Sequence, residues 1–187
     1  MNKNATPLVL LSPTEGAKRD GVSWFEVAGG RDSLMIARGS DGGEIARAEV
    51  KRVGERQGSV ELTSGEITAN YSIELIGSGS ELAIRVEAGG KVTTIGPGQT
   101  DDPVGGIDFD PDQVSLIALW GSVRDPLVRL ADDLASSARS DSANWDIAPC
   151  GLTWLGVSIG AGACAIGVLV SCAAALVGAG TFVEHCL

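Results

Sequence analysis

Apolar and polar residues alternate in short runs from residue 22 to residue 95, with glycine, serine and aspartate between the runs. In one run, Tyr71, Ile73 and Leu75 fall on one face of an extended chain, and the residues between them are polar. This period of two predicts an antiparallel β-meander with one buried face and one face in water. The expected strands are Val22–Ala28, Ser33–Arg38, Glu44–Val53, Ser59–Thr63, Glu66–Ile76, Glu81–Glu87 and Lys91–Ile95.

Two helical patterns follow the strands. Asp110 and Pro111 are typical of an N-cap and a first-turn proline, and they predict a helix over residues 111–120. A second helix is expected from Asp125, because apolar residues recur at helical spacing beyond it. We expect these one or two helices to cover the sheet, which makes the fold class α+β.

The carboxy-terminal part of the chain differs from the rest because no residue from Ile147 to Val183 carries a formal charge. This stretch is longer than the roughly 20 residues that cross a bilayer as a helix, and moving it out of water desolvates no ion. It is therefore apolar enough to enter a membrane. A plain tail anchor is one interpretation, although an anchor needs only one apolar helix.

The same stretch is rich in glycine, which favours a small helical hairpin over one lipid-facing helix. We expect helices over residues 152–160 and 163–176, a turn at Gly160–Gly162, and an end near Gly178. Small residues let two helices approach backbone to backbone. The expected helix contacts are Gly156, Gly160 and Gly167.

All four cysteines lie in this quarter of the chain, at Cys150, Cys164, Cys172 and Cys186. A segment too small to be held together by burial is often held by disulfides, so we favour two bridges. Four cysteines allow three connectivities, and the sequence does not choose among them. Free buried thiols are the main alternative. Metal binding is disfavoured, because there is no Cys-x-x-Cys pair and His185 is the only histidine.

Charge narrows the choice of partners. The formal net charge is −10 and the isoelectric point is about 4.5, which argues against nucleic acid and against attraction to anionic membranes, since both need clustered Lys and Arg. The apolar run Pro7–Leu11 is shorter than the core of a signal peptide. We therefore expect no recognisable N-terminal signal peptide.

Catalytic motifs are not evident in the sequence. It has no Gly-x-Ser-x-Gly elbow and no phosphate loop, and a single histidine restricts histidine-based triads. Paired carboxylates at residues 101–102, 108–112 and 132–133 would suit calcium binding or acid–base chemistry. Residues 108–112 lack the glycine and distal glutamate of a calcium loop, so we favour a solvated acidic connection. We expect a protein that is not an enzyme and that needs no cofactor or metal.

Four segments of the tail carry a resemblance to a known family. Cys150–Gly156, Gly160–Gly167, Ser171–Gly180 and Phe182–Leu187 resemble the cysteine-rich halocins, peptide antibiotics of salt-loving archaea, and related bacteriocin-like peptides. The resemblance covers about 40 residues. It implies a precursor whose C-terminal peptide is released and inhibits related cells. It also implies that disulfides through the four cysteines hold the mature peptide together.

Together these features divide the chain into three parts. Residues 1–134 would be an acidic leader, carrier or self-protection domain. Residues 135–146 are small and polar and would be a linker with a cleavage region at Arg139 and Ser140, although a plain surface loop has the same composition. Residues 147–187 would be the peptide.

The expected partners follow from this division. The target-cell membrane, or a protein in it, would bind the peptide, and the N-terminal domain would contact the peptide in cis as an inhibitor. The peptide would be secreted after processing, or the chain would be membrane-associated. A membrane-anchored structural or interaction protein is the alternative function.

Overall fold

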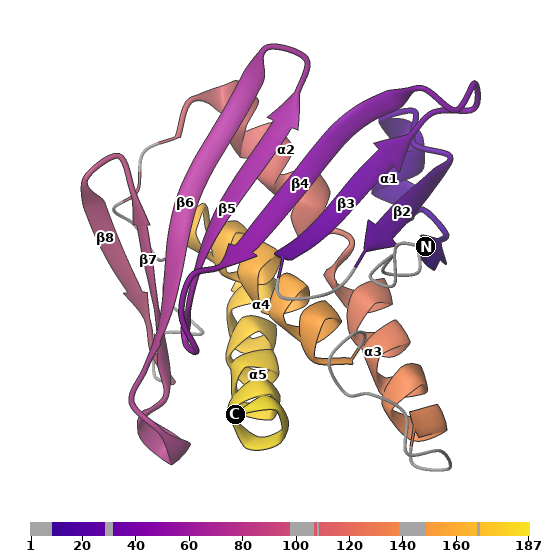
Figure 1. Ribbon diagram of the computed structural model, residues 1–187. Coiled ribbons are helices and arrows are strands. Elements are labelled where there is room, and N and C mark those ends of the chain that lie inside the picture. The colour runs from indigo at the N-terminus through magenta and orange to yellow at the C-terminus, as the bar shows by residue number, and fades with distance from the viewer. Residues whose placement is uncertain (1–8, 29–31, 98–106, 108, 139–148, 168) are drawn as a thin grey trace.

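The computed structural model describes residues 9–28, 32–97, 107, 109–138, 149–167 and 169–187, and its fold is α+β as the sequence predicts (Figure 1). Eight antiparallel strands form one sheet in sequential order, so each strand pairs with the next along the chain. The strands are β1 (Val9–Leu11), β2 (Trp24–Ala28), β3 (Asp32–Arg38), β4 (Glu44–Arg52), β5 (Gln57–Ser64), β6 (Ile67–Ile76), β7 (Ala83–Ala88) and β8 (Lys91–Ile95).

The period-two pattern places the core on one face of this sheet. Phe25, Met35, Leu62 and Ile84 are fully buried on the inner face, whereas the residues that alternate with the buried ones are mostly polar. The predicted meander with one wet face is therefore confirmed. All seven expected strands are found as β2 to β8, with ends shifted by a few residues.

Two short elements near the N-terminus were not expected. Strand β1 pairs with β2 at the sheet edge, with Leu10 opposite Glu26. Helix α1 (Glu15–Arg19) follows it and is capped by Thr14, whose hydroxyl accepts a hydrogen bond from the Ala17 N–H. Elements of three and five residues are too short for a hydrophobic period to identify them.

Helices α2 and α4 pack directly on the inner face, and α3 and α5 flank α4 (Figure 1). Asp110 caps α2 as expected, because its carboxylate accepts from the Gln113 N–H at 2.9 Å, and the Gln113 side chain accepts from the Asp110 N–H. The helices are α2 (Pro111–Gly121), α3 (Arg124–Ala138), α4 (Pro149–Ala165) and α5 (Leu169–Cys186), and a short 3-10 helix, η1 (Gly79–Glu81), precedes β7.

The expected helical hairpin is present, but its predicted turn is wrong. Helix α4 continues through Gly160–Gly162 to Ala165, and the chain leaves it at Gly167, whose φ of +97° suits glycine. Helix α5 likewise continues past Gly178 to Cys186. Burial explains the difference, since packing around a glycine in a core helix overrides its poor helix propensity.

Substitution of two helix glycines tests this explanation. A Cβ added at Gly162 would overlap the ring of Tyr71, whereas a Cβ at Gly180 meets nothing within 4 Å. We predict that Gly162→Ala lowers the free energy of unfolding by about 1–3 kcal/mol. Gly180→Ala should raise it by roughly 0.5–1 kcal/mol through helix propensity. Denaturant titration followed by circular dichroism measures both, and equal effects would contradict the packing account.

Candidate functional site: the C-terminal helical hairpin

Helix α4 is the central element of the hydrophobic core. From Gly151 to Ala165 every residue except Thr153 is buried. The helix contacts strands β3, β5, β6, β7 and β8 on one side and the three helices α2, α3 and α5 on others. The charge-free segment is thus packed inside the protein, and its neighbours along the inner sheet face belong to the same core cluster.

The Trp154 ring of α4 packs the hairpin against the sheet. The ring lies over Gly58 of β5, where an added Cβ would come within 2.8 Å of it. Its other neighbour is Phe182 of α5, with ring centroids 4.9 Å apart. The Arg52 guanidinium of β4 in turn lies 5.0 Å from the Phe182 ring centre. One aromatic pair therefore contacts both helices of the hairpin and two strands.

Tyr71 makes a second anchor between sheet and hairpin. Its hydroxyl donates a hydrogen bond of 2.9 Å to the Ser158 carbonyl of α4. Gly162, one turn further on, leaves the space that the Tyr71 ring occupies. Complete burial raises the pKa of the Tyr71 phenol well above its ordinary value of 10, because the phenolate would lose its hydration.

The expected contact glycines occupy different places. Gly160 faces the Arg124 stem of α3 and Ala175 of α5, so both neighbouring helices approach α4 there. Gly156 faces Val128 of α3 at 3.9 Å from its would-be Cβ. Gly167 has no such neighbour and lies in the turn between the two helices.

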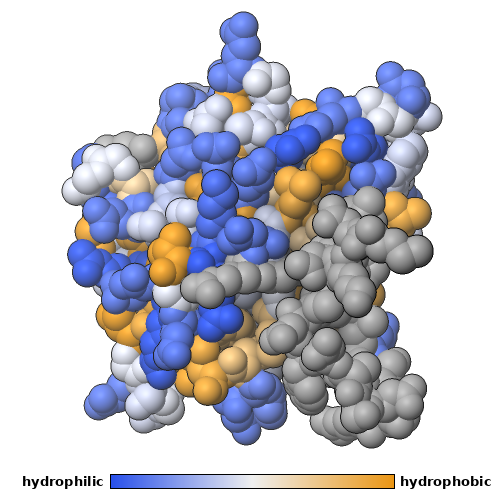
Figure 2. Space-filling view, viewed as in Figure 1, coloured by the Kyte–Doolittle hydropathy of each residue, from blue (hydrophilic) through white to orange (hydrophobic). Residues whose placement is uncertain are grey.

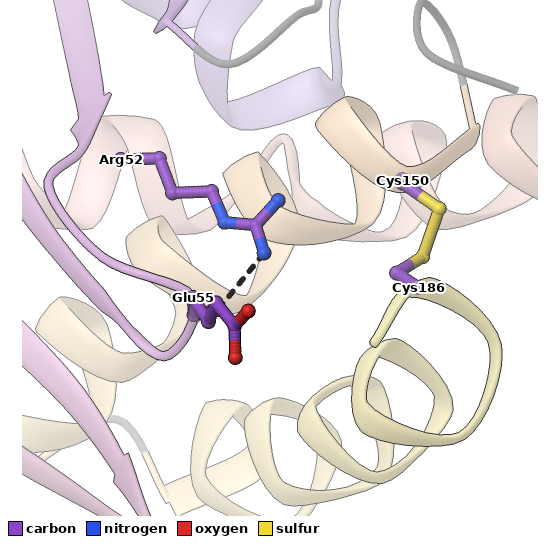
Figure 3. Close-up of a disulfide and its surroundings, with 4 residues drawn as sticks. All are labelled: Arg52, Glu55, Cys150 and Cys186. Carbon is purple, nitrogen blue, oxygen red and sulfur yellow. Dashed lines mark hydrogen bonds between the residues drawn. A yellow bond between two sulfur atoms is a disulfide. The ribbon is translucent and has the colours of Figure 1, made fainter.

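Two disulfides fasten the hairpin at its two ends. Cys150–Cys186 joins the start of α4 to the end of α5 (Figure 3), and Cys164–Cys172 closes the end next to the turn. The expected disulfides are therefore present, in one of the three possible connectivities, and no cysteine remains free. Both bonds lie within residues 150–186, so neither ties the hairpin to the sheet.

The predicted cleavage region is only partly visible. Helix α3 includes residues 135–138, the first four of the predicted linker. Arg139 and Ser140 lie outside the described residues. Between α3 and the start of α4, residues 139–148 supply the covalent connection between the two parts of the chain.

The outer face of the sheet carries much of the charge. Arg38 pairs with Glu26, Arg47 with Glu44, and Arg85 lies 3.8 Å from a Glu74 oxygen. The hydrogen bond from Arg47 holds the pKa of the Glu44 carboxyl below its usual range. The polar outer face thus lies on the opposite side of the sheet from the hairpin, which carries no formal charge up to Val183. Figure 2 shows a predominantly hydrophilic surface over the strands.

The described part of the chain contains no group of three His, Cys, Asp or Glu residues placed to hold a metal ion. Within the same residues, no helix combines the length and apolar character needed to cross a bilayer. Comparison with protein-family models, with curated proteins and with solved structures found no match.

Several residues that build the site had no signal in the sequence. Gly58 accommodates Trp154, and Gly121 of α2 accommodates Ala163, whose methyl group lies 2.7 Å from a would-be Cβ. The indole nitrogen of Trp154 is buried without a hydrogen-bond partner among the described residues. Each depends on a neighbour distant in the chain, which a local pattern does not encode.

Removing each disulfide tests how the hairpin is held. In the chain-entropy model, the Cys150–Cys186 loop, with a separation of 36, contributes about 4 kcal/mol, and the Cys164–Cys172 loop, with a separation of 8, contributes about 2.5 kcal/mol. We predict that replacing Cys150 and Cys186 together by alanine lowers the free energy of unfolding more than replacing Cys164 and Cys172 together. Denaturant titration of both variants measures this, and the reverse order would contradict the model.

Tyr71 provides a spectroscopic test, because it is the only tyrosine. Unfolded tyrosine ionises near pH 10, and the native pKa is raised. The contribution of the Tyr71 phenol to the free energy of unfolding is therefore constant below about pH 10. It falls as the pH rises further, because the phenol then ionises in the unfolded chain but not in the folded one. We predict that tyrosinate absorbance near 295 nm appears only together with loss of the circular-dichroism signal. If Tyr71 were half-ionised near pH 10 while the protein remained folded, its buried position would be contradicted.

Proposed function

We propose that this chain is the precursor of a halocin-like antimicrobial peptide. In this proposal, cleavage in residues 135–146 frees the α4–α5 hairpin, which then acts on membranes of related cells. The observation that carries the proposal is the placement of the disulfides, both of which lie within residues 150–186. One backbone cut before Cys150 leaves no covalent link between hairpin and sheet.

The N-terminal part would act as a carrier in cis. Its inner sheet face covers α4, and its outer face carries ion pairs that keep the precursor in water. The apolar surface of α4 that faces the sheet is therefore hidden until the hairpin leaves the sheet. Because the two parts share one core, we expect the hairpin to stay bound after cleavage until a membrane competes for it.

The membrane interface would supply a hydrogen-bond partner for the indole N–H of Trp154, which has none among the described residues of the core. A buried indole N–H without a partner costs about 1–3 kcal/mol, and tryptophan favours the bilayer interface, where its ring is apolar and its N–H is hydrated. From residue 147 to residue 183 the segment has no formal charge. Entry would then depend on apolar burial and close helix packing, without attraction to anionic lipid.

A leakage assay tests the proposal. An oxidised peptide of residues 140–187 should release dye from neutral vesicles at least as well as from anionic ones, because it contains three acidic residues and no Lys or Arg. It should also inhibit related strains, whereas the intact chain should do neither. A peptide with all four cysteines replaced by alanine is the matched control. It should release less dye, because a hairpin without disulfides loses more conformational entropy when it becomes ordered in the membrane. Adding residues 1–139 should suppress leakage by covering the peptide again.

Two outcomes would oppose the proposal. If the oxidised peptide neither releases dye from vesicles nor inhibits growth at any salt concentration, the proposed antimicrobial activity is contradicted. An uncleaved chain that sediments with vesicles would instead support the membrane-anchored alternative.

A further inference from the structure

A groove lies between α3 and α5, with α4 as its floor. Both helices pack on α4, and the space left between them has a volume of about 450 Å³. That size falls in the range of about 300–1,000 Å³ that is typical of small-molecule sites. The groove is distinct from the sheet side of α4, where Trp154 and Tyr71 lie.

The lining of the groove is mostly apolar, with Thr153 and Thr181 as its uncharged polar residues, and small residues keep it open. Val128 of α3 and Val177 of α5 are both exposed, by 38% and 71%. On the floor, Gly156 leaves open space, because its would-be Cβ has only Val128 within 4 Å. Exposing these valines to water is unfavourable in free energy, and a hydrocarbon chain bound in the groove would cover them.

Among the residues that the structure describes, Arg124 is the only charged one that lines the groove. Its side chain is 14% exposed, and its stem packs against Gly160. Its ion pair is with Asp125, whose side chain is 64% exposed, so the pair contributes little. A guanidinium has five N–H donors, which leaves capacity for a second carboxylate. The described lining of the groove therefore combines one positive group with mostly apolar walls.

We propose that the groove binds a fatty acid anion. The hydrocarbon chain would lie along Val128, Gly156 and Val177, and the carboxylate would accept hydrogen bonds from Arg124. An organic cation is disfavoured by the charge of Arg124, and an uncharged alcohol would lack its ionic contact. This inference goes beyond the proposed function and does not depend on it.

Dodecanoate, titrated into the full chain below its critical micelle concentration, is the probe. Calorimetry should show saturable one-to-one binding, at least about tenfold tighter than dodecanol, and no binding of dodecyltrimethylammonium. Arg124→Gln should remove this preference for the anion, and Arg124→Lys should restore most of it. Ala174→Phe, which fills the groove, should abolish binding of both dodecanoate and dodecanol.

Matched controls separate these effects from loss of folding. Arg129 is exposed on α3 and Ala118 is exposed on α2, and neither lines the groove. Arg129→Gln and Ala118→Phe should therefore bind dodecanoate like the original chain, and all variants should keep its circular-dichroism spectrum. Equal affinity for dodecanoate and dodecanol, unsaturable binding, or association only with phosphatidylglycerol vesicles would each overturn the proposal.

Discussion

The structure depends on the burial of α4 between the inner face of the sheet and three other helices. Alone, a sheet with one apolar face would expose that face to water, and the uncharged α4 has no polar side to offer the solvent. Packed together they form one core, with Trp154 over Gly58 and the Tyr71 hydroxyl bonded to the Ser158 carbonyl. Each part therefore supplies the cover that the other lacks.

Covalent and noncovalent forces are divided between different parts of this arrangement. The two disulfides hold α4 to α5 and not to the sheet, whereas apolar packing and the buried hydrogen bond from Tyr71 hold the hairpin on the sheet. This division is what makes a separable peptide physically reasonable. It also means that separation must expose the inner face of the sheet, so the hairpin needs a competing apolar environment.

The sequence predicted the features that depend on local periodicity or local chemistry. Alternation located the strands around Tyr71, Ile73 and Leu75, and Asp110 marked the start of α2. The cysteines indicated disulfides but not their pairing. The sequence predicts a turn at Gly160–Gly162, because glycine occurs both in turns and in closely packed helices. The contacts with Arg124, Ala175 and Tyr71, which are distant in the chain, show that these glycines belong to a packed helix.

The shared core is tested most directly by hydrogen–deuterium exchange of the intact chain. The amides of α4 should be among the slowest in the protein and should exchange together with those of β5 and β6, since opening either requires unfolding of both. An α4 that exchanges freely while β5 and β6 stay protected would show that the hairpin is a loosely attached appendage, which would contradict this account.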